Sequence, residues 1–563
     1  METNSFDAIV VGTGMSGGWA AKELTEKGLK TLVLERGRMV RHGEYPTATT
    51  DPWDLPFGNR ITQETRERKP VQTRSVYPTP SNNHWFVDDQ DHPYSEADGS
   101  RFDWIRGYHV GGRSIMWARQ SYRFSRMDFE ANAKEDVGIP WPVSYDEIAP
   151  WYDYVETFAG ISGASDGLAQ LPDGKFLPPM ELNCVELEFK QRLGEKLGRS
   201  LIIGRTANLT APLTHNESPQ RATCQYRNLC IRGCPYGAYF SSLSATLPSA
   251  ERTGNMTLKA NQIVYEIIYD NEKGKATGVR VLDAETGAQT DYFARVVFLC
   301  ASTLGSTFIM MNSLSSRFPN GFGNDSGELG HNLVDHLKAA GVSATVDGHE
   351  DVAYTGRRAN GYYVPRYQNL GKEKRDYLRG FGYQGRASRS GVGRFNNSSL
   401  IGAELKQAVQ EPGPWVLNLS SFGEILPNHL NHATIDRTRK DKHGLPVLKI
   451  DTKLRENEFA MQKDMVADAV QMFETAGYKN IHIGENNYGM GLSIHEAGAA
   501  RMGSDPRKSV LNKFNQVHAC KNVYVTDGSF MASSACQNPS LTYMAFTARA
   551  ASHAVEELKK GNL

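Results

Sequence analysis

The chain has 563 residues, and 63 Lys plus Arg are balanced by 63 Asp plus Glu, which leaves a formal net charge of zero. This balance argues against a nucleic-acid binder or an anionic-membrane binder, because both depend on a basic surface. Hydrophobic residues make up 39% of the chain and aromatic residues 10%, which is too much for a disordered protein. The length predicts several domain-sized units or two larger bodies.

The start of the chain and its cysteines bear on the cellular compartment. No apolar window is long enough to predict a membrane span. Residues 1–5 carry neither a basic region nor a twin arginine, so we expect no export signal in this chain. Seven cysteines are an odd number, which favours clustered ligands or buried thiols over a disulfide framework.

The first 35 residues predict a strand, a glycine-rich turn, a helix and a second strand. Residues 6–11 are apolar, GTGMSG follows at 12–17, and a second apolar run at 29–34 ends at Glu35. Gly12 permits a sharp turn, Gly14 lets backbone amides approach a pyrophosphate, and Gly17 allows close packing of helix and sheet. Glu35 is spaced to accept hydrogen bonds from a ribose. The segment predicts a dinucleotide site, the alternative being a glycine-rich turn without a ligand.

The rest of the chain predicts two structural units. Residues 37–100 have little periodicity and indicate a loop excursion, whereas alternation over 255–300 indicates a small antiparallel sheet that leads into a strand at 296–299. Residues 337–489 are strand-like and turn-rich, with a helical stretch at 456–476, and 523–525 indicate another strand. We therefore expect an α/β fold. A discontinuous Rossmann-like domain (1–336 and 490–563) receives an inserted α+β substrate domain (337–489) built on a mainly antiparallel sheet.

Several motifs, in one order over nearly the whole chain, resemble the glucose–methanol–choline (GMC) oxidoreductase family of flavoproteins. They are GTGMSG (12–17) with Glu35, GGRS (111–114), GHNLVDH (330–336), DKHGLP (441–446), HEAGAARMG (495–503), TDGS (526–529) and NPSLT (538–542). The resemblance implies FAD as the dinucleotide. The residues that it implies for binding FAD are Gly12, Gly14, Gly17, Glu35, Gly112, Ser114, Asp527, Asn538 and Thr542.

One departure from the family concerns the attachment of the flavin. Some relatives link FAD through a histidine two residues after the serine of the second glycine motif, and this chain has Met116 there. A thioether cannot form a histidyl linkage. We therefore expect FAD to be bound without a covalent bond.

The resemblance implies a catalytic pair, His495 and Asn538. An imidazole that is neutral near pH 7 can remove the hydroxyl proton of an alcohol while hydride leaves for the flavin. Asn538 would bind the substrate oxygen. Without the motifs, the plainer interpretations are a structural histidine and a turn asparagine before proline. We expect His336 to be structural and His109 to be a loop or packing residue.

Three cysteines form a C-x5-C-x3-C-P run at 224–235: Cys224, Cys230 and Cys234. Such a loop is typical of cluster ligation, whereas structural zinc requires four ligands. A disulfide with a spare thiol, or three unconnected cysteines, would also be consistent with the run. The spacing resembles that of bacterial FAD-dependent glucose, gluconate and glucoside 3-dehydrogenases, which implies a [3Fe-4S] cluster that passes electrons onward.

The sequence thus predicts an FAD-dependent dehydrogenase that oxidises a hydroxyl, first of all at C3, of a pyranose or glycoside. Glucose C1 or gluconate C2 is the runner-up. The two remaining alternatives are an oxygen-reducing sugar oxidase and a non-catalytic electron-transfer flavoprotein subunit. The resemblance further implies a small accessory subunit with an export signal, a cytochrome c acceptor and periplasmic location by co-export, with a cytoplasmic enzyme as the alternative. An apolar surface is expected near 224–234, where a partner docks.

Overall fold

The computed structural model describes residues 4–563 except 76, 214–220, 355–358, 373, 396–397 and 487. Its first elements are β1 (Ser5–Val11), α1 (Met15–Glu26) and β2 (Thr31–Leu34), as the sequence predicts. β1 lies in parallel between β2 and β8 (Gln289–Leu299), and all four residues of β2 are buried. A strand buried on both faces requires helices above and below the sheet, which explains its continuous apolar run.

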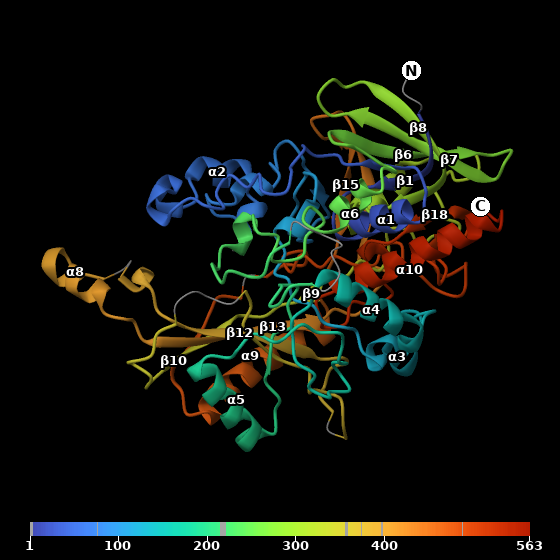
Figure 1. The fold of residues 1–563 in the computed structure, drawn as a ribbon. Helices are drawn as coiled ribbons and strands as arrows, with labels where there is room; N and C mark the ends of the chain where they lie inside the picture. Colours follow the sequence, from blue (N-terminus) through green and yellow to red (C-terminus); the bar gives the residue numbers. More distant parts are fainter. Residues whose placement is uncertain are drawn as a thin grey trace.

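The sheet built on β1 has eight strands in the described part of the chain (Figure 1). Its main order is β17-β18-β8-β1-β2-β5, with β5 at Met256–Lys259, β17 at Gln516–Val517 and β18 at Cys520–Val525. The strands β6 (Gln262–Asp270) and β7 (Lys275–Asp283) form an antiparallel hairpin, and β7 pairs with the first part of β8. The carboxy-terminal strand β18 is parallel to β8. The sheet therefore combines distant parts of the chain.

α1 packs on β1, β2 and β8 of this sheet and in turn contacts other helices. α1 contacts α6 (Thr246–Arg252) and α10 (Ser540–Lys559), and α10 also contacts α4 (Tyr145–Ala159). Gly17 lets the first turn of α1 lie close to the glycine turn, because a Cβ at this position would be only 2.0 Å from the Gly12 carbonyl oxygen. The role expected for Gly17 in packing follows from this distance.

A second sheet is antiparallel and lies in the lower body of Figure 1. Its order is β16-β10-β13-β12-β11-β4, and β9 also pairs with β13. α5 (Cys184–Leu197) and α9 (Glu456–Thr475) pack on it. The strand bounds are β4 Ile202–Ile203, β9 His336–Leu337, β10 Val342–Val346, β11 Tyr362–Val364, β12 Phe381–Arg389, β13 Trp415–Glu424 and β16 Lys479–Ile483.

A third, small sheet connects the predicted units. It consists of β14 (His432–Lys440), β15 (Pro446–Asp451) and β3 (Ser95–Glu96), where β3 comes from the loop excursion. Conversely, β4 and α5 precede residue 337 and yet belong to the antiparallel body. The division of the chain at 336/337 and 489/490 therefore stays a prediction, while the expected fold class, a Rossmann-like sheet with a mainly antiparallel second sheet, is confirmed.

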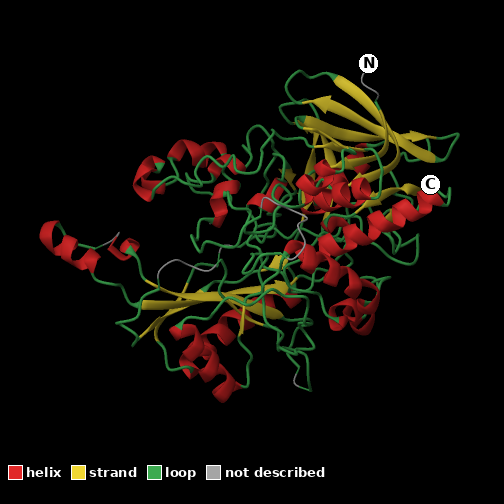
Figure 2. Ribbon diagram, in the orientation of Figure 1, coloured by secondary structure: helices red, strands yellow, loops and turns green. Residues whose placement is uncertain are grey.

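Loops occupy much of the space between the two large sheets (Figure 2). The remaining α-helices are α2 (Gln63–Arg68), α3 (Arg126–Glu135), α7 (Thr303–Asn312) and α8 (Gly402–Gln410). Short 3-10 helices are η1 Pro52–Asp54, η2 Pro56–Asn59, η3 Gln72–Arg74, η4 Asn83–Trp85, η5 Gly112–Ile115, η6 Cys230–Arg232, η7 Val392–Phe395 and η8 Gly528–Phe530. Within the described residues, no helix has the length and apolar character needed to cross a bilayer.

Candidate active site

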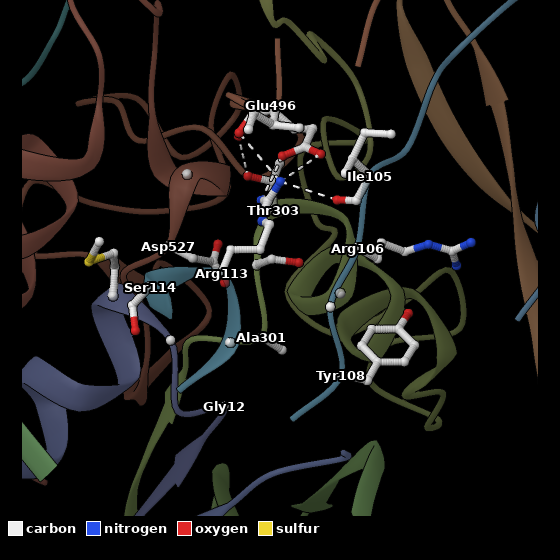
Figure 3. A pocket seen from close by; sticks show the side chains of 18 of the residues that line it. Gly12, Ile105, Arg106, Tyr108, Arg113, Ser114, Ala301, Thr303, Glu496 and Asp527 are labelled. Carbon is white, nitrogen blue, oxygen red and sulfur yellow. Dashed lines mark hydrogen bonds and ion pairs between the residues drawn. The ribbon is translucent and has the colours of Figure 1, made fainter. Parts of the chain in front are cut away.

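One cavity between the two large sheets collects most of the residues that the sequence singles out. Seven of the nine residues expected to bind FAD line it: Gly12, Gly14, Glu35, Gly112, Ser114, Asp527 and Asn538. Figure 3 shows Gly12, Ser114 and Asp527 around this cavity, with Arg113 and Glu496 beside them. The other two, Gly17 and Thr542, are not part of its wall. The hydroxyl of Thr542 lies instead 2.8 Å from that of Tyr152, where α10 meets α4.

The glycine turn presents the amino terminus of α1 to the cavity. Gly12 has φ +99°, and a Cβ there would lie 2.4 Å from the Cys300 carbonyl oxygen, so only glycine fits. Gly14 caps α1 without a side-chain hydrogen bond, and the first turn carries no acidic residue. A Cβ at Gly14 would meet nothing within 4 Å. Met15 and Ser16 of the first turn also line the cavity, as a site for an anion at the amino terminus of a helix requires.

Glu35 lies at the end of β2 beside this turn and is 6% exposed. One carboxylate oxygen accepts hydrogen bonds from the Thr13 hydroxyl at 2.6 Å and the Thr13 amide at 3.2 Å. The other oxygen accepts from the Gly37 amide at 2.9 Å. Burial raises the pKa of Glu35, and these hydrogen bonds lower it in opposition. The carboxyl group retains lone pairs for the hydroxyl donors of a ribose.

An ion pair joins the second glycine motif to the segment that contains His495. Arg113 Nη2 lies 2.8 Å from Glu496 Oε2, and Arg113 also donates to the Ile105 carbonyl at 3.3 Å (Figure 3). The Thr303 hydroxyl donates to the Glu496 backbone carbonyl. Asp527, also in the cavity wall, accepts from the Ser306 and Ser529 hydroxyls. The dinucleotide half of the cavity and the segment 494–496 are therefore held together.

His495 and Asn538 meet in this cavity, with His495 Nε2 3.4 Å from Asn538 Nδ2. The backbone amide of His495 donates to Asp335 Oδ1 at 3.0 Å, and Asp335 Oδ2 accepts from the Gly491 amide at 2.8 Å. Burial, followed by the charge of Glu496, raises the pKa of Asp335 to about 7. Asp335 thus anchors the backbone of His495 rather than its ring.

His336 fixes the proton on the His495 ring. His336 Nε2 lies 3.3 Å from the Ser534 carbonyl oxygen, and His336 Nδ1 lies 2.9 Å from His495 Nδ1. A carbonyl only accepts, so His336 Nε2 carries the hydrogen and His336 Nδ1 is the acceptor. His495 Nδ1–H must then donate, which leaves the lone pair of His495 on Nε2, facing Asn538. The contact adds an interaction with the predicted base to the structural role that the sequence analysis expects of His336.

Both imidazoles are held neutral. Burial lowers the pKa of His336 to about 4. Burial also lowers the pKa of His495 well below its usual value, and the positive charges of Arg113 and Lys338 lower it further. An uncharged imidazole is the form that can accept a proton.

Gln384 of β12 fixes the orientation of the other partner. Gln384 Nε2 donates to Asn538 Oδ1 at 2.6 Å, so the Asn538 amide nitrogen is the atom directed at His495. The cavity wall thereby presents one acceptor, His495 Nε2, and one donor, Asn538 Nδ2–H, and at 3.4 Å the two atoms lie within hydrogen-bond reach of each other and of one shared substrate oxygen. This arrangement can take the proton of an alcohol and hydrogen-bond to its oxygen at the same time. Sequence analysis did not identify Gln384, because no local motif surrounds it.

Comparisons with known proteins agree with this geometry. The family patterns described as GMC oxidoreductase match residues 6–338 and 427–547. The chain belongs to the GMC oxidoreductase family. It is 26% identical to the 2-methyl-1,2-propanediol dehydrogenase of Mycolicibacterium austroafricanum (97% of this chain, 94% of that protein). It is 24% identical to the fructose dehydrogenase large subunit of Gluconobacter japonicus (100% and 99%) and 23% identical to the gluconate 2-dehydrogenase flavoprotein of Pantoea cypripedii (97% and 93%).

Solved structures support the same fold. The pyridoxine 4-oxidase of Mesorbium loti superposes with a TM-score of 0.59 at 17% identity, over 97% of this chain and 98% of that one. GMC oxidoreductases bind FAD, and the cavity fits it. The open amino terminus of α1 and the gap at Gly14 would hold the pyrophosphate, and Glu35 would hold the adenosine ribose.

The cysteine loop of this GMC oxidoreductase borders the same cavity through Ile231 of η6. Cys224, Cys230 and Cys234 are free thiols of intermediate exposure. Burial raises the pKa of Cys224, and the charges of Cys230 and Cys234 raise it further, so the three groups lie within electrostatic range. Within the described part of the chain, however, no three Cys, His, Asp or Glu side chains are grouped closely enough to hold a metal ion.

Apolar side chains are exposed around this loop, as the sequence predicts. Tyr226 is 42% exposed, Ile231 37% and Tyr236 42%. The guanidinium of Arg227 lies 5.3 Å from the Tyr236 ring centroid. The loop thus connects the cavity wall with an exposed surface.

Proposed function

We propose that this GMC oxidoreductase oxidises a hydroxyl group of a pyranose sugar or a glycoside, with the secondary hydroxyl at C3 as the first choice. Oxidation at glucose C1 or gluconate C2 is the alternative. The observation that carries the proposal is the pairing of a lone-pair nitrogen, His495 Nε2, with the donor Asn538 Nδ2 at 3.4 Å in the cavity that fits FAD. The names of two relatives, fructose dehydrogenase and gluconate 2-dehydrogenase, support a sugar.

In this proposal His495 accepts the hydroxyl proton and Asn538 hydrogen-bonds to the substrate oxygen as its charge develops. Bound FAD supplies the acceptor for the hydride. Gln384 and His336 keep the two catalytic atoms in their donor and acceptor roles. A non-catalytic electron-transfer subunit is disfavoured, because electron relay alone requires no general base.

A sugar panel with an artificial electron acceptor tests the function, and NMR of the products locates the new carbonyl. His495→Ala is expected to retain FAD and to lose about 10²–10⁴-fold in kcat. Turnover of that variant at the wild-type rate would contradict the role of His495. Asn538→Ala, which leaves His495 in place, is the matched comparison.

The proposal includes FAD bound without a covalent linkage. Met116 lines the cavity at the position where a histidyl linkage would form, and its thioether cannot make that bond. Acid precipitation is expected to release all of the FAD into the supernatant. A flavin-bearing tryptic peptide in the pellet would refute this part.

We further propose that Cys224, Cys230 and Cys234 are ligands of a [3Fe-4S] cluster. The C-x5-C-x3-C-P spacing and the position of Ile231 at the cavity wall support it, whereas the absence of a metal-holding group among the described residues does not. A cluster there would supply a one-electron acceptor. Iron and sulfide analysis with EPR of purified protein is the test. Iron-free protein that reduces O2 with sugar would favour the oxidase alternative.

The remaining part concerns partners and location. We propose a small accessory subunit that carries the export signal, a cytochrome c as the acceptor, and a periplasmic complex, with a cytoplasmic enzyme as the alternative. The exposed Tyr226, Ile231 and Tyr236 support docking at the cysteine loop. Fractionation of the host, following sugar-dependent dye reduction, tests it. Cytoplasmic activity without a co-purifying subunit would overturn it.

A further inference from the structure

The cavity wall that includes His495 and Asn538 also contains a buried cation without an acidic partner. Arg119 lines the cavity with His495 and Asn538 and is only 5% exposed. Its Nη1 donates to the Trp117 carbonyl, and Nη2 reaches the Ala359 carbonyl only at 3.5 Å. Among the described residues its Nε has no hydrogen-bond partner, and the charge meets a neutral ring rather than a carboxylate, since the guanidinium carbon lies 5.5 Å from the Tyr239 ring centroid. A buried guanidinium without a counter-charge is costly.

The backbone holds Arg119 in this place against local preference. Its φ is +62°, in the left-handed region that side chains other than glycine rarely adopt. Its carbonyl oxygen accepts from the Ala207 amide at 2.9 Å and the Ser121 hydroxyl at 3.0 Å, which fixes the conformation. Strained residues that the surroundings hold in place cluster at ligand sites.

The acidic residues of the cavity wall are all engaged elsewhere. Glu496 pairs with Arg113, Asp527 accepts from Ser306 and Ser529, Glu35 accepts from Thr13, and Asp441 lies 3.8 Å from Arg36. A second cation adds to the positive field, because Lys338 Nζ lies 3.8 Å from the ring centroid of Phe422, which lines the cavity. Lys338 donates to the Ser420 hydroxyl at 3.0 Å rather than to a carboxylate. None of the carboxylates of the cavity wall is therefore left to pair with Arg119.

We propose that Arg119 binds a carboxylate of the substrate, so that the enzyme acts on sugar acids in preference to neutral sugars. This inference rests on the proposed oxidation of a sugar hydroxyl and narrows its substrate class. Nε–H and one Nη2–H form one side of the guanidinium, the side on which a carboxylate accepts two parallel hydrogen bonds. A neutral sugar supplies oxygen atoms but no charge to offset the buried cation.

A rival occupant is the cofactor itself, since a cation beside a flavin also stabilises negative charge on its ring. The two occupants differ in one measurable respect. A cation that serves the flavin affects every substrate by the same factor, whereas one that serves a carboxylate affects only acids. Substrate pairs that differ only in charge therefore separate them.

The experiment compares gluconate with glucitol and glucuronate with glucose, using the full chain and an artificial acceptor. Arg119→Gln removes the charge, and Arg119→Lys keeps the charge but loses the second parallel bond. Arg36→Gln is the control, because Arg36 is a second cation in the wall of the same cavity and follows Glu35, the residue expected to bind the ribose. Flavin content and the unfolding midpoint of each variant identify damage to the fold.

The wild type is expected to prefer the acid in at least one pair. Arg119→Gln should lower kcat/KM for that acid by about 10–100-fold, the range for a charge-assisted hydrogen bond, and for its neutral partner by less than about 3-fold. Arg119→Lys should fall between, and Arg36→Gln should affect both members equally. Equal losses on acid and neutral sugar in Arg119→Gln, or a wild type that prefers neutral sugars, would overturn the proposal.

Binding without turnover separates this inference from the proposed function. Equilibrium dialysis of His495→Ala against gluconate and glucitol measures recognition alone, with or without Arg119→Gln. If no sugar is oxidised by the wild type, the proposed function fails, yet tighter gluconate binding that Arg119→Gln removes still supports the site. Equal binding of gluconate and glucitol would refute it.

Discussion

Gln384→Glu is the sharpest test of how the catalytic pair is oriented. The side chain keeps its size, but the new carboxylate cannot donate to Asn538 Oδ1, which in the wild type accepts from Gln384 at 2.6 Å. The Asn538 amide is then expected to turn over, with its nitrogen toward the carboxylate. Its oxygen would face His495 Nε2, where the structure places Nδ2 at 3.4 Å. The substrate oxygen would lose a donor and meet an acceptor.

The magnitude follows from the loss of one oriented donor at a developing oxyanion, about 10²–10³-fold in kcat. The loss should also depend on pH. An ordinary glutamate has a pKa near 4.3, and burial raises it. When the introduced carboxyl group is protonated it can again donate to Asn538 Oδ1. The kcat of the variant should therefore rise as pH falls, while the pKa of His495, lowered by burial, keeps the base neutral.

The assay is steady-state sugar oxidation with a saturating artificial acceptor between pH 8 and pH 5. Gln120→Glu is the matched control, since Gln120 lines the same cavity and its Oε1 only accepts from the Tyr122 hydroxyl at 2.7 Å. A carboxylate can also accept that bond, so this variant should stay within a few-fold of wild type at every pH. If the kcat of Gln384→Glu fell no further than that of this control, or if it rose with rising pH, the proposed orientation of Asn538 would be refuted.

Three further predictions concern the cofactor and stability. Gly14→Ala should fold normally and lose FAD affinity by more than tenfold, because the added Cβ extends only into the cavity. Gly12→Ala should destabilise the apoprotein, because its Cβ would lie 2.4 Å from the Cys300 carbonyl oxygen. Flavin fluorescence measures the first effect and thermal unfolding the second. Burial lowers the pKa values of His109 and His336 to about 4, so the folded protein binds fewer protons than the unfolded chain below pH 6.5. The free energy of unfolding, measured with urea, should therefore be highest above pH 6.5 and fall toward pH 4. The expected fall is on the order of 3 kcal/mol per histidine. His109→Gln should make the free energy of unfolding less dependent on pH, and an unchanged dependence would contradict a lowered pKa of His109 in the folded protein.

The fold was predictable where local patterns carry it. The apolar run 6–11 corresponds to β1, the glycine turn precedes α1, and the helical stretch predicted at 456–476 corresponds to α9. The alternation over 255–300 became β6, β7 and β8. Long-range pairing was harder to predict. β4 has two residues, and no local pattern indicates that Ile202 and Ile203 pair with β11 in the antiparallel body.

The candidate site was predictable only where motifs surround its residues. His495 and Asn538 lie in such motifs, and the structure brings them together. His336 also lies in one, yet its role depends on a ring contact with a residue 159 positions later in the chain. Gln384 lies in an ordinary strand whose alternation indicates only which face it occupies. Hydrogen-bond polarity is a property of contacts between elements, so the sequence alone could not indicate it.

These contacts also divide the cavity into parts that can vary independently. Arg113 and Glu496 join the cofactor loop to the segment of the base, and Asp335 accepts from its backbone. A change in the antiparallel body therefore leaves the base in place relative to the FAD cradle. The exceptions are His336 of β9, which contacts the His495 ring, and Gln384 of β12, which holds Asn538. Substitutions elsewhere on β12 and β13 should alter which sugar binds, whereas a substitution of Gln384 should alter the chemistry itself.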